Sequence, residues 1–347
     1  MPDLDALSWT LLALVVVLAV CFDFINGFHD TANAIATVIA TRVLSTSTAI
    51  LMAAGLNFIG ALTGQAVAKT ITSGLVDPAS VQRLDFASAQ LMVMAALIGA
   101  ITWNLITWYY GIPSSSSHAL IGGVVGAGIA ALGAQDVVWS GLLTKVVLPL
   151  IFSPIIGFFV SALLMRVLFR LFGNASPERV GNLFRRLQIG SSAFMAFSHG
   201  SNDAQKTMGI ITLALFSAGI LHAAPGKTPD VPVEVILIAA TAMALGTAAG
   251  GWRIIHTMGN RLTHLEPIHG FAAETTAATV IETASRFGFP LSTTHTISSC
   301  ILGVGAARRA SGVRWTVAFN MIRAWIYTIP VCAGIAFVTY WVLDLFV

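Results

Sequence analysis

Charged residues are scarce in this 347-residue chain. Asp, Glu, Lys and Arg together make up 10% of the sequence, whereas about a quarter is usual in a soluble domain. Hydrophobic residues make up 56%, and the mean hydropathy is +0.84. These values exclude a water-soluble protein and predict an all-α polytopic membrane protein. The net charge of +3 gives no sign of a nucleic-acid-binding face.

The chain is also poor in cysteine. Cys21, Cys300 and Cys332 lie in apolar runs without Cys-x-x-Cys spacing. They are typical of small buried hydrophobic residues, so we expect neither disulfides nor a cysteine metal site. A basic N-terminal segment is missing too, because Asp3 and Asp5 stand where a cleaved signal peptide needs positive charge. We therefore expect the first apolar run to remain as a span.

Ten apolar stretches are long enough to cross a bilayer, which takes about 20 residues. Several are too long for one straight span, so we expect broken or re-entrant helices. If the N-terminus lies outside, most loop arginines face the cytoplasm and only Lys69, Arg83, Lys227 and Arg286 face outward. This bias predicts that both termini lie outside. The stretches are residues 8–41, 48–71, 86–110, 114–133, 137–172, 188–221, 232–256, 268–287, 291–308 and 315–346.

Two groups of polar residues interrupt these apolar stretches. In each group the spacing is i, i+3, i+4, i+7, which is one face of an α-helix. Each group contains Gly-x-x-Asp, ending at Asp30 and at Asp203. Because an ionisable residue inside a membrane is costly, it predicts a functional site. The first polar face consists of Asn26, His29, Asp30 and Asn33, and the second of His199, Asn202, Asp203 and Lys206.

A second motif also occurs twice. Residues 113–118 read Pro-Ser-Ser-Ser-Ser-His, and residues 290–295 read Pro-Leu-Ser-Thr-Thr-His. The chain is therefore predicted to consist of a first repeat, residues 1–175, a cytoplasmic connecting loop, residues 176–187, and a second repeat, residues 188–347. Five apolar stretches in each half would give the two repeats inverted topology.

The proline-serine motif is typical of a helix that starts inside the membrane. Proline suits the first helical turn and hydroxyl side chains suit the cap. Such a start directs free N–H groups and a positive dipole end at one point, which favours an oxyanion. A carboxylate nearby would repel that anion unless Asp30 and Asp203 bind a proton or Na⁺. The sequence therefore predicts cation-coupled symport of an oxyanion.

Other interpretations account for less of the pattern. Polar residues and small residues in spans can serve helix packing alone, but a purely structural protein leaves the duplicated aspartates unexplained. A Ser/His hydrolase inside the membrane has no need of two copies of its site, and no nucleophile elbow is visible. We therefore expect a transporter and not an enzyme.

The same residues resemble a known family. Asn-Gly-Phe-His-Asp-Thr-Ala-Asn-Ala at 26–34, Phe-Ser-His-Gly-Ser-Asn-Asp at 197–203 and the two proline motifs are similar to those of the PiT inorganic phosphate transporters, especially the bacterial low-affinity phosphate permeases. The resemblance covers nearly the whole chain. It implies two inverted-topology repeats with broken helices, two re-entrant helical hairpins, and import of inorganic phosphate across the bacterial inner membrane by alternating access.

The resemblance also implies roles for individual residues. Glu274 matches a glutamate that is functionally important in Na⁺-coupled relatives, whereas Asn57 stands where those relatives have a glutamate. The implied substrate-binding residues are Ser114, Ser115, Ser116, Ser117, Ser292, Thr293, Thr294, Asn33 and Lys206. The implied cation-coupling residues are Asp30, Asp203, Asn202, Glu274, Asn26, His29 and His199.

Lys206 determines which coupling ion we expect. It stands where the second repeat would have an asparagine, and it can pair with Asp203 or face the phosphate. Either role takes the place of a Na⁺, so H⁺ is favoured; the alternatives are Na⁺ bound at Asp30 and Asp203, or a permease for another oxyanion such as sulfate. Similar permeases accept phosphate as a divalent-metal complex. We expect no cofactor. The expected partners are phosphate and membrane lipid, and the sequence leaves open whether the protein forms a homo-oligomer.

Overall fold

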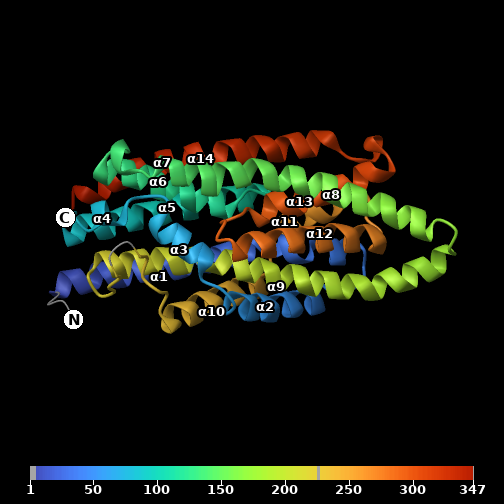
Figure 1. Ribbon diagram of the computed structural model, residues 1–347, viewed down its shortest axis with the longest axis horizontal. Helices are drawn as coiled ribbons and strands as arrows, with labels where there is room; N and C mark the ends of the chain where they lie inside the picture. The colour runs from blue at the N-terminus through green and yellow to red at the C-terminus, as the bar shows by residue number, and fades with distance from the viewer. Residues whose placement is uncertain (1–4, 225–226, 347) are drawn as a thin grey trace.

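The computed structural model describes residues 5–224 and 227–346, and this part of the chain is helical without a β-sheet (Figure 1). Each of the ten expected apolar stretches coincides with one helix or with a run of consecutive helices. The helices are α1 (Ala6–Ala40), α2 (Thr46–Ala61), α3 (Ala66–Ser73), α4 (Pro78–Val81), α5 (Phe86–Tyr110), α6 (Ser116–Leu132), α7 (Trp139–Gly141), a π-helical turn (Leu142–Val147), α8 (Leu148–Phe172), α9 (Pro177–Ser217), α10 (Val233–Ala249), α11 (Trp252–Asn260), α12 (Pro267–Arg286), α13 (Thr293–Arg308) and α14 (Trp315–Asp344), with short 3₁₀ turns at Ala134–Asp136 and Ala310–Gly312.

Several helices have the length and composition of membrane spans. Among the described residues, four helical segments qualify alone: α1, α5, the segment Trp139–Phe172, and α14. Two further spans are broken, because α2 meets α3 at 69° and α10 meets α11 at 70°. The breaks predicted for the longest apolar stretches are wrong for residues 8–41, 188–221 and 315–346, which form the unbroken helices α1, α9 and α14; the breaks occur instead in residues 48–71 and 232–256. The protein is therefore a multi-pass membrane protein, and each of its two halves contains one bent helix pair.

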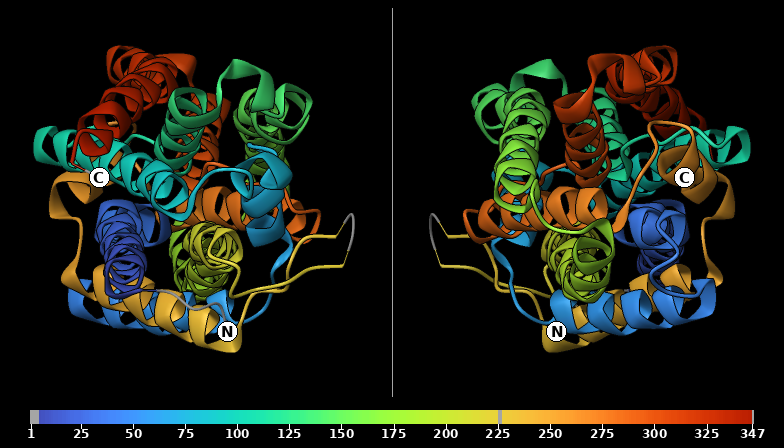
Figure 2. Two further views of the ribbon diagram at one scale, coloured as in Figure 1. Left: turned by 90° about the vertical axis from the view of Figure 1, so that its left-hand side faces the viewer. Right: turned by 90° about the vertical axis from the view of Figure 1, so that its right-hand side faces the viewer.

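The two longest helices, α1 and α9, form the centre of the molecule. They contact each other and run in opposite directions, α1 leading away from the N-terminus at the left of Figure 1 and α9 returning toward that end. End-on, α2 and α10 lie along one side of this pair, and α6, α8, α13 and α14 lie on the other (Figure 2). The helices α1 and α9, which contain the two Gly-x-x-Asp motifs, are therefore oriented oppositely, as inverted repeats require.

Corresponding glycines bring corresponding helices into backbone contact. A Cβ on Gly27 of α1 would lie 2.5 Å from the carbonyl oxygen of Met243 of α10. A Cβ on Gly200 of α9 would lie 2.5 Å from the Cα of Asn57 of α2. Both distances are shorter than a real Cβ tolerates, so only glycine permits these helix crossings. Each half thus packs its first long helix against the bent pair of the other half.

We expect Gly200→Ala to disrupt the packing of α9 on α2. The added methyl group would press on main-chain atoms, which cannot move aside as a side-chain end can, so the cost should lie at the upper end of the usual range for overpacking, about 3 kcal/mol. Thermal unfolding of the purified protein in detergent would measure it. Gly190→Ala, also on α9, is the matched control, because nothing lies within 4 Å of its added Cβ. Equal melting temperatures for the two variants would contradict this account of the crossing.

The prediction that residues 176–187 form a loop is wrong, because most of this segment is helical. α9 begins at Pro177, so most of this segment is helical and only residues 173–176 lie between α8 and α9. The helix start has the usual signals, with Ser176 at the cap position, Pro177 in the first turn and Glu178 near the positive dipole end. An apolar-span criterion overlooked them because these turns are polar.

Two short helices begin in the interior. α6 has 17 residues and α13 has 16, each less than a straight span needs. Each follows a longer helix through a left-handed glycine, Gly111 with φ 63° and Gly288 with φ 74°. The chain can turn there because glycine has no Cβ. The first hairpin (α5–α6) and the second hairpin (α12–α13) are the two re-entrant hairpins expected from the repeated proline motif.

Candidate functional site

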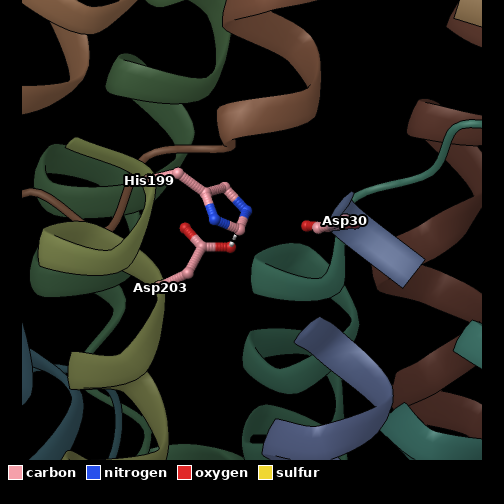
Figure 3. A group of neighbouring side chains, drawn as sticks. All are labelled: Asp30, His199 and Asp203. Carbon is pink, nitrogen blue, oxygen red and sulfur yellow. Dashed lines mark ion pairs between the residues drawn. The ribbon is translucent and has the colours of Figure 1, made fainter. Parts of the chain in front are cut away.

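Asp30, His199 and Asp203 converge at the interface between α1 and α9. One carboxylate or imidazole atom from each lies within 4.8 Å of the others, and all three residues are buried (Figure 3). The i, i+4 spacing of His199 and Asp203 puts both on the face of α9 that meets Asp30 on α1. The two polar faces of the sequence therefore meet at one central site.

Lys206 pairs with Asp203 in this site. Its Nζ donates to Asp203 Oδ1 at 2.6 Å, one helical turn away, and both side chains are buried. His199 Nε2 lies 3.7 Å from the other carboxylate oxygen of Asp203. Of the two roles expected for Lys206, pairing with Asp203 is the one the geometry has.

Asp30 is connected to the first hairpin through a histidine. His29 Nδ1 lies 2.5 Å from Asp30 Oδ1, and His29 Nε2 lies 3.1 Å from Thr107 Oγ1 near the end of α5. Ser114 then donates to Thr107 at 2.8 Å. A hydrogen-bonded chain therefore runs from the start of the first hairpin's turn to the Asp30 carboxylate, so a change at either end is felt at the other.

The second hairpin reaches the central site directly. Thr293 donates to Asp203 Oδ2 at 3.4 Å, and Asn33 donates to Thr293 at 3.1 Å and to Thr294 at 2.9 Å. Asn33 belongs to the first polar face, yet its partners belong to the second half of the chain. Residues expected to bind substrate and residues expected to bind a cation thus share hydrogen bonds.

Serines cap both interior helices. Ser115 accepts from the backbone N–H of His118, and Ser292 accepts from that of His295, each at 3.2 Å. The two caps are equivalent, which explains why the motif recurs. Ser117 donates to the carbonyl of Leu291 in the other hairpin at 3.0 Å, so the hairpin starts touch. Ser116 is buried and its hydroxyl has no partner among the described residues, which leaves it for a ligand.

Of three further residues expected to couple the cation, two make hydrogen bonds outside the central cluster and one makes none among the described residues. Glu274 accepts from Thr37, from Ser191 at 2.5 Å and from Gln188 at 3.2 Å, and none of these donors belongs to the central cluster. Asn202 donates to Ser285 and Phe289 at the second hairpin, while Asn26 is buried with neither side-chain atom paired among the described residues. The structure therefore separates these residues into a central group and a group beside it.

Asp23 is a buried carboxylate that the sequence reasoning missed. It is fully buried in α1, and Asp203 and Lys206 of α9 are the charged groups that act on it. A signal was present, because Asp23 lies seven residues before Asp30 and therefore on the same helix face. The search for repeated residues did not find it, since Ala196 occupies the corresponding position of the second repeat.

The cluster has the chemistry to bind an anion and a cation together. Asp30 and Asp203 supply two carboxylates against the single ammonium of Lys206, so the site has an excess of negative groups to attract a cation. The starts of α6 and α13 supply hydroxyls and positive helix ends to attract an anion. Each bound ion lowers the cost of binding the other.

Comparisons with known proteins match the chain to phosphate transporters. The sequence profile of the phosphate transporter family matches residues 26–336. A probable low-affinity inorganic phosphate transporter of Rhizobium meliloti is 48% identical over 98% of each chain, and one of Bacillus subtilis is 46% identical over 96% of this chain and 97% of its own. A solved structure described as the sodium-dependent phosphate transporter is 26% identical, with a TM-score of 0.86 over 97% of this chain and all of the other.

Proposed function

The chain belongs to the phosphate transporter family, and on that premise we propose that it imports inorganic phosphate by symport with H⁺ through alternating access. One observation supports this most strongly: hydroxyls of both hairpins connect to the two central aspartates. Thr293 bonds to Asp203 directly, and Ser114 reaches Asp30 through Thr107 and His29. Anion binding at the hairpins and cation binding at the aspartates therefore depend on each other.

The buried Lys206–Asp203 pair favours H⁺ over Na⁺. An ammonium 2.6 Å from the Asp203 carboxylate neutralises a group that would otherwise coordinate Na⁺. Lys206 also takes the position that the first repeat gives to Asn33, so the two halves cannot form equivalent Na⁺ sites. The second candidate is Na⁺ coupling. It is favoured because the similar solved structure is described as a sodium-dependent transporter, and it needs a Na⁺ site formed at Asp30 to which Lys206 does not contribute.

We also propose that phosphate enters as a complex with a divalent metal. Asp30, His199 and Asp203 offer two carboxylates and an imidazole within 4.8 Å. Imidazole nitrogen is a ligand that divalent transition metals accept and Na⁺ rarely does. In this proposal the metal is part of the substrate, and the hairpin hydroxyls hold its phosphate.

The two repeats supply the moving parts. α1 and α9 keep the aspartates at the centre, while the hairpins lie between helices of opposite halves, so a rocking of one half against the other would expose the site to each side in turn. We also propose that both termini lie outside the bacterial inner membrane, which the distribution of arginines supports.

Uptake of labelled phosphate into proteoliposomes tests the proposal. In sodium-free buffer, an inward proton gradient should stimulate uptake, an equimolar divalent transition metal such as Zn²⁺ should raise it further, and excess sulfate should leave it unchanged. Uptake that begins only when Na⁺ is added would support the second candidate and reject H⁺ coupling. Competition by sulfate would reject selectivity for phosphate, and uptake that chelation of divalent metals leaves unchanged would reject the metal complex.

A further inference from the structure

The Asp23 carboxylate takes no part in the hydrogen-bonded network of the central site. It is fully buried, and neither oxygen of its carboxylate has a hydrogen-bond partner among the described residues. Burying an ionised carboxylate in an apolar interior without a partner costs roughly several kcal/mol of free energy. Such a group is therefore neutralised by a proton or a cation. Structural packing alone would be served better by an apolar residue.

The polar groups around Asp23 are also unpaired. Asn26 lies one turn further along α1, and both atoms of its amide lack partners. Thr207 of α9 is buried, and its hydroxyl has no partner either. Asn26 and Thr207 are the side chains placed to hydrogen-bond to the Asp23 carboxyl group, although none of these atoms reaches it with normal hydrogen-bond geometry. A carboxylate can only accept, from the Thr207 hydroxyl and the Asn26 amide nitrogen, whereas a protonated carboxyl group can also donate to the Asn26 amide oxygen.

The charges near Asp23 leave it without a counterion. Lys206 is the only cation acting on it among the described residues, and its ammonium is already bonded to Asp203 at 2.6 Å. Asp203 itself is the other charged group that acts on Asp23, and it repels a second negative charge. His29 and Asp30, on the same helix, pair with each other.

We propose that Asp23 is the residue that holds the transported proton. This rests on the proposed H⁺ symport and names its coupling residue. The proton enters from outside water onto the Asp23 carboxylate, and it returns to cytoplasmic water when the site opens inward. While Asp23 is neutral, Lys206 remains with Asp203 and phosphate can bind. When Asp23 gives up its proton, its carboxylate competes with Asp203 for the Lys206 ammonium, and the phosphate side of the site is rearranged.

The absence of a second copy sets the number of such residues. The corresponding position in the second repeat is Ala196, so the structure has one residue of this kind and not two. The proton site is thus asymmetric within an otherwise repeated fold. One proton per transport cycle is expected to pass through Asp23.

Separating exchange from gradient-driven uptake tests this role. Phosphate exchange between equal internal and external concentrations requires no net proton movement, whereas uptake against a concentration gradient does. Asp23→Asn mimics the neutral form of the side chain, so we expect it to keep the exchange rate within about threefold of the native protein. Proton-driven uptake should fall by at least about 90%, which is about one order of magnitude and corresponds to about 1.4 kcal/mol. Asp23→Glu should restore driven uptake, and Asp344→Asn, at the exposed end of α14, is the matched control.

The outcomes distinguish this inference from the proposed function. If the native protein neither exchanges nor accumulates phosphate, the proposed function fails. If the native protein is driven by protons and Asp23→Asn is driven equally, the assignment of Asp23 is wrong. Should Asp23→Asn not fold, infrared spectroscopy of the native protein and Asp23→Glu decides: a protonated-carboxyl band that shifts between them supports the assignment, and an identical band contradicts it.

Discussion

Asp30→Asn is expected to lower proton-driven phosphate uptake by about 100-fold. Asp30 accepts its hydrogen bond from His29 at 2.5 Å, and it is one of the three residues that converge at the centre. Asparagine keeps the shape but removes the charge, so the metal of the proposed metal–phosphate complex loses a ligand and the hydrogen-bonded chain from Ser114 loses its end point. Hydrogen bonds to charged groups are worth about 1.5–3 kcal/mol, and the upper end of that range corresponds to about 100-fold.

Labelled-phosphate uptake into proteoliposomes would measure this loss. Asp230→Asn makes the same chemical change at an exposed residue whose bond to Lys69 lies at the surface, where ion pairs contribute little. Size-exclusion chromatography should show both variants eluting as the native protein does. Full uptake by Asp30→Asn in the same vesicles would remove Asp30 from the coupling mechanism.

The central site was predictable because its spacing repeats. Asp30 and Asp203 occupy equivalent positions in two similar polar helix faces. Two inverted helices that cross at the centre bring these equivalent positions together. The caps at Ser115 and Ser292 follow from the same logic, since proline and hydroxyl residues begin helices wherever they occur. Local patterns that appear twice are therefore the ones that sequence reasoning could place.

Features that occur once were not predictable in this way. Asp23 has Ala196 as its counterpart, and the first turns of α9 have a polar composition that an apolar-span criterion passes over. The hydrogen-bond partners of Glu274 come from α1 and α9, and no spacing along α12 indicates which residues those are. Contacts between distant segments depend on how the helices cross, and that is settled only by packing of the whole bundle.

Lys206→Asn is expected to exchange proton dependence for sodium dependence. The substitution gives the second polar face the same residue that Asn33 supplies to the first, and it leaves Asp203 buried without its ammonium partner. Removing one member of a buried ion pair typically costs about 3–5 kcal/mol, because the remaining charge is uncompensated. Na⁺ can take the vacated charge, with oxygen ligands from Asp203, Asp30 and the new asparagine.

Two measurements on Lys206→Asn separate this from simple damage. In sodium-free buffer its melting temperature in detergent should fall by several degrees, and added Na⁺ should restore much of the loss, since a ligand that binds only the folded state stabilises it. The native protein and Lys145→Asn, which removes an exposed lysine, should show no response to Na⁺. Proton-driven uptake by Lys206→Asn should fall at least about tenfold, the effect of losing 1.4 kcal/mol, and Na⁺ should revive it. A variant that is unstable and indifferent to Na⁺ would mean that Lys206 holds Asp203 for structural reasons and does not select the coupling ion.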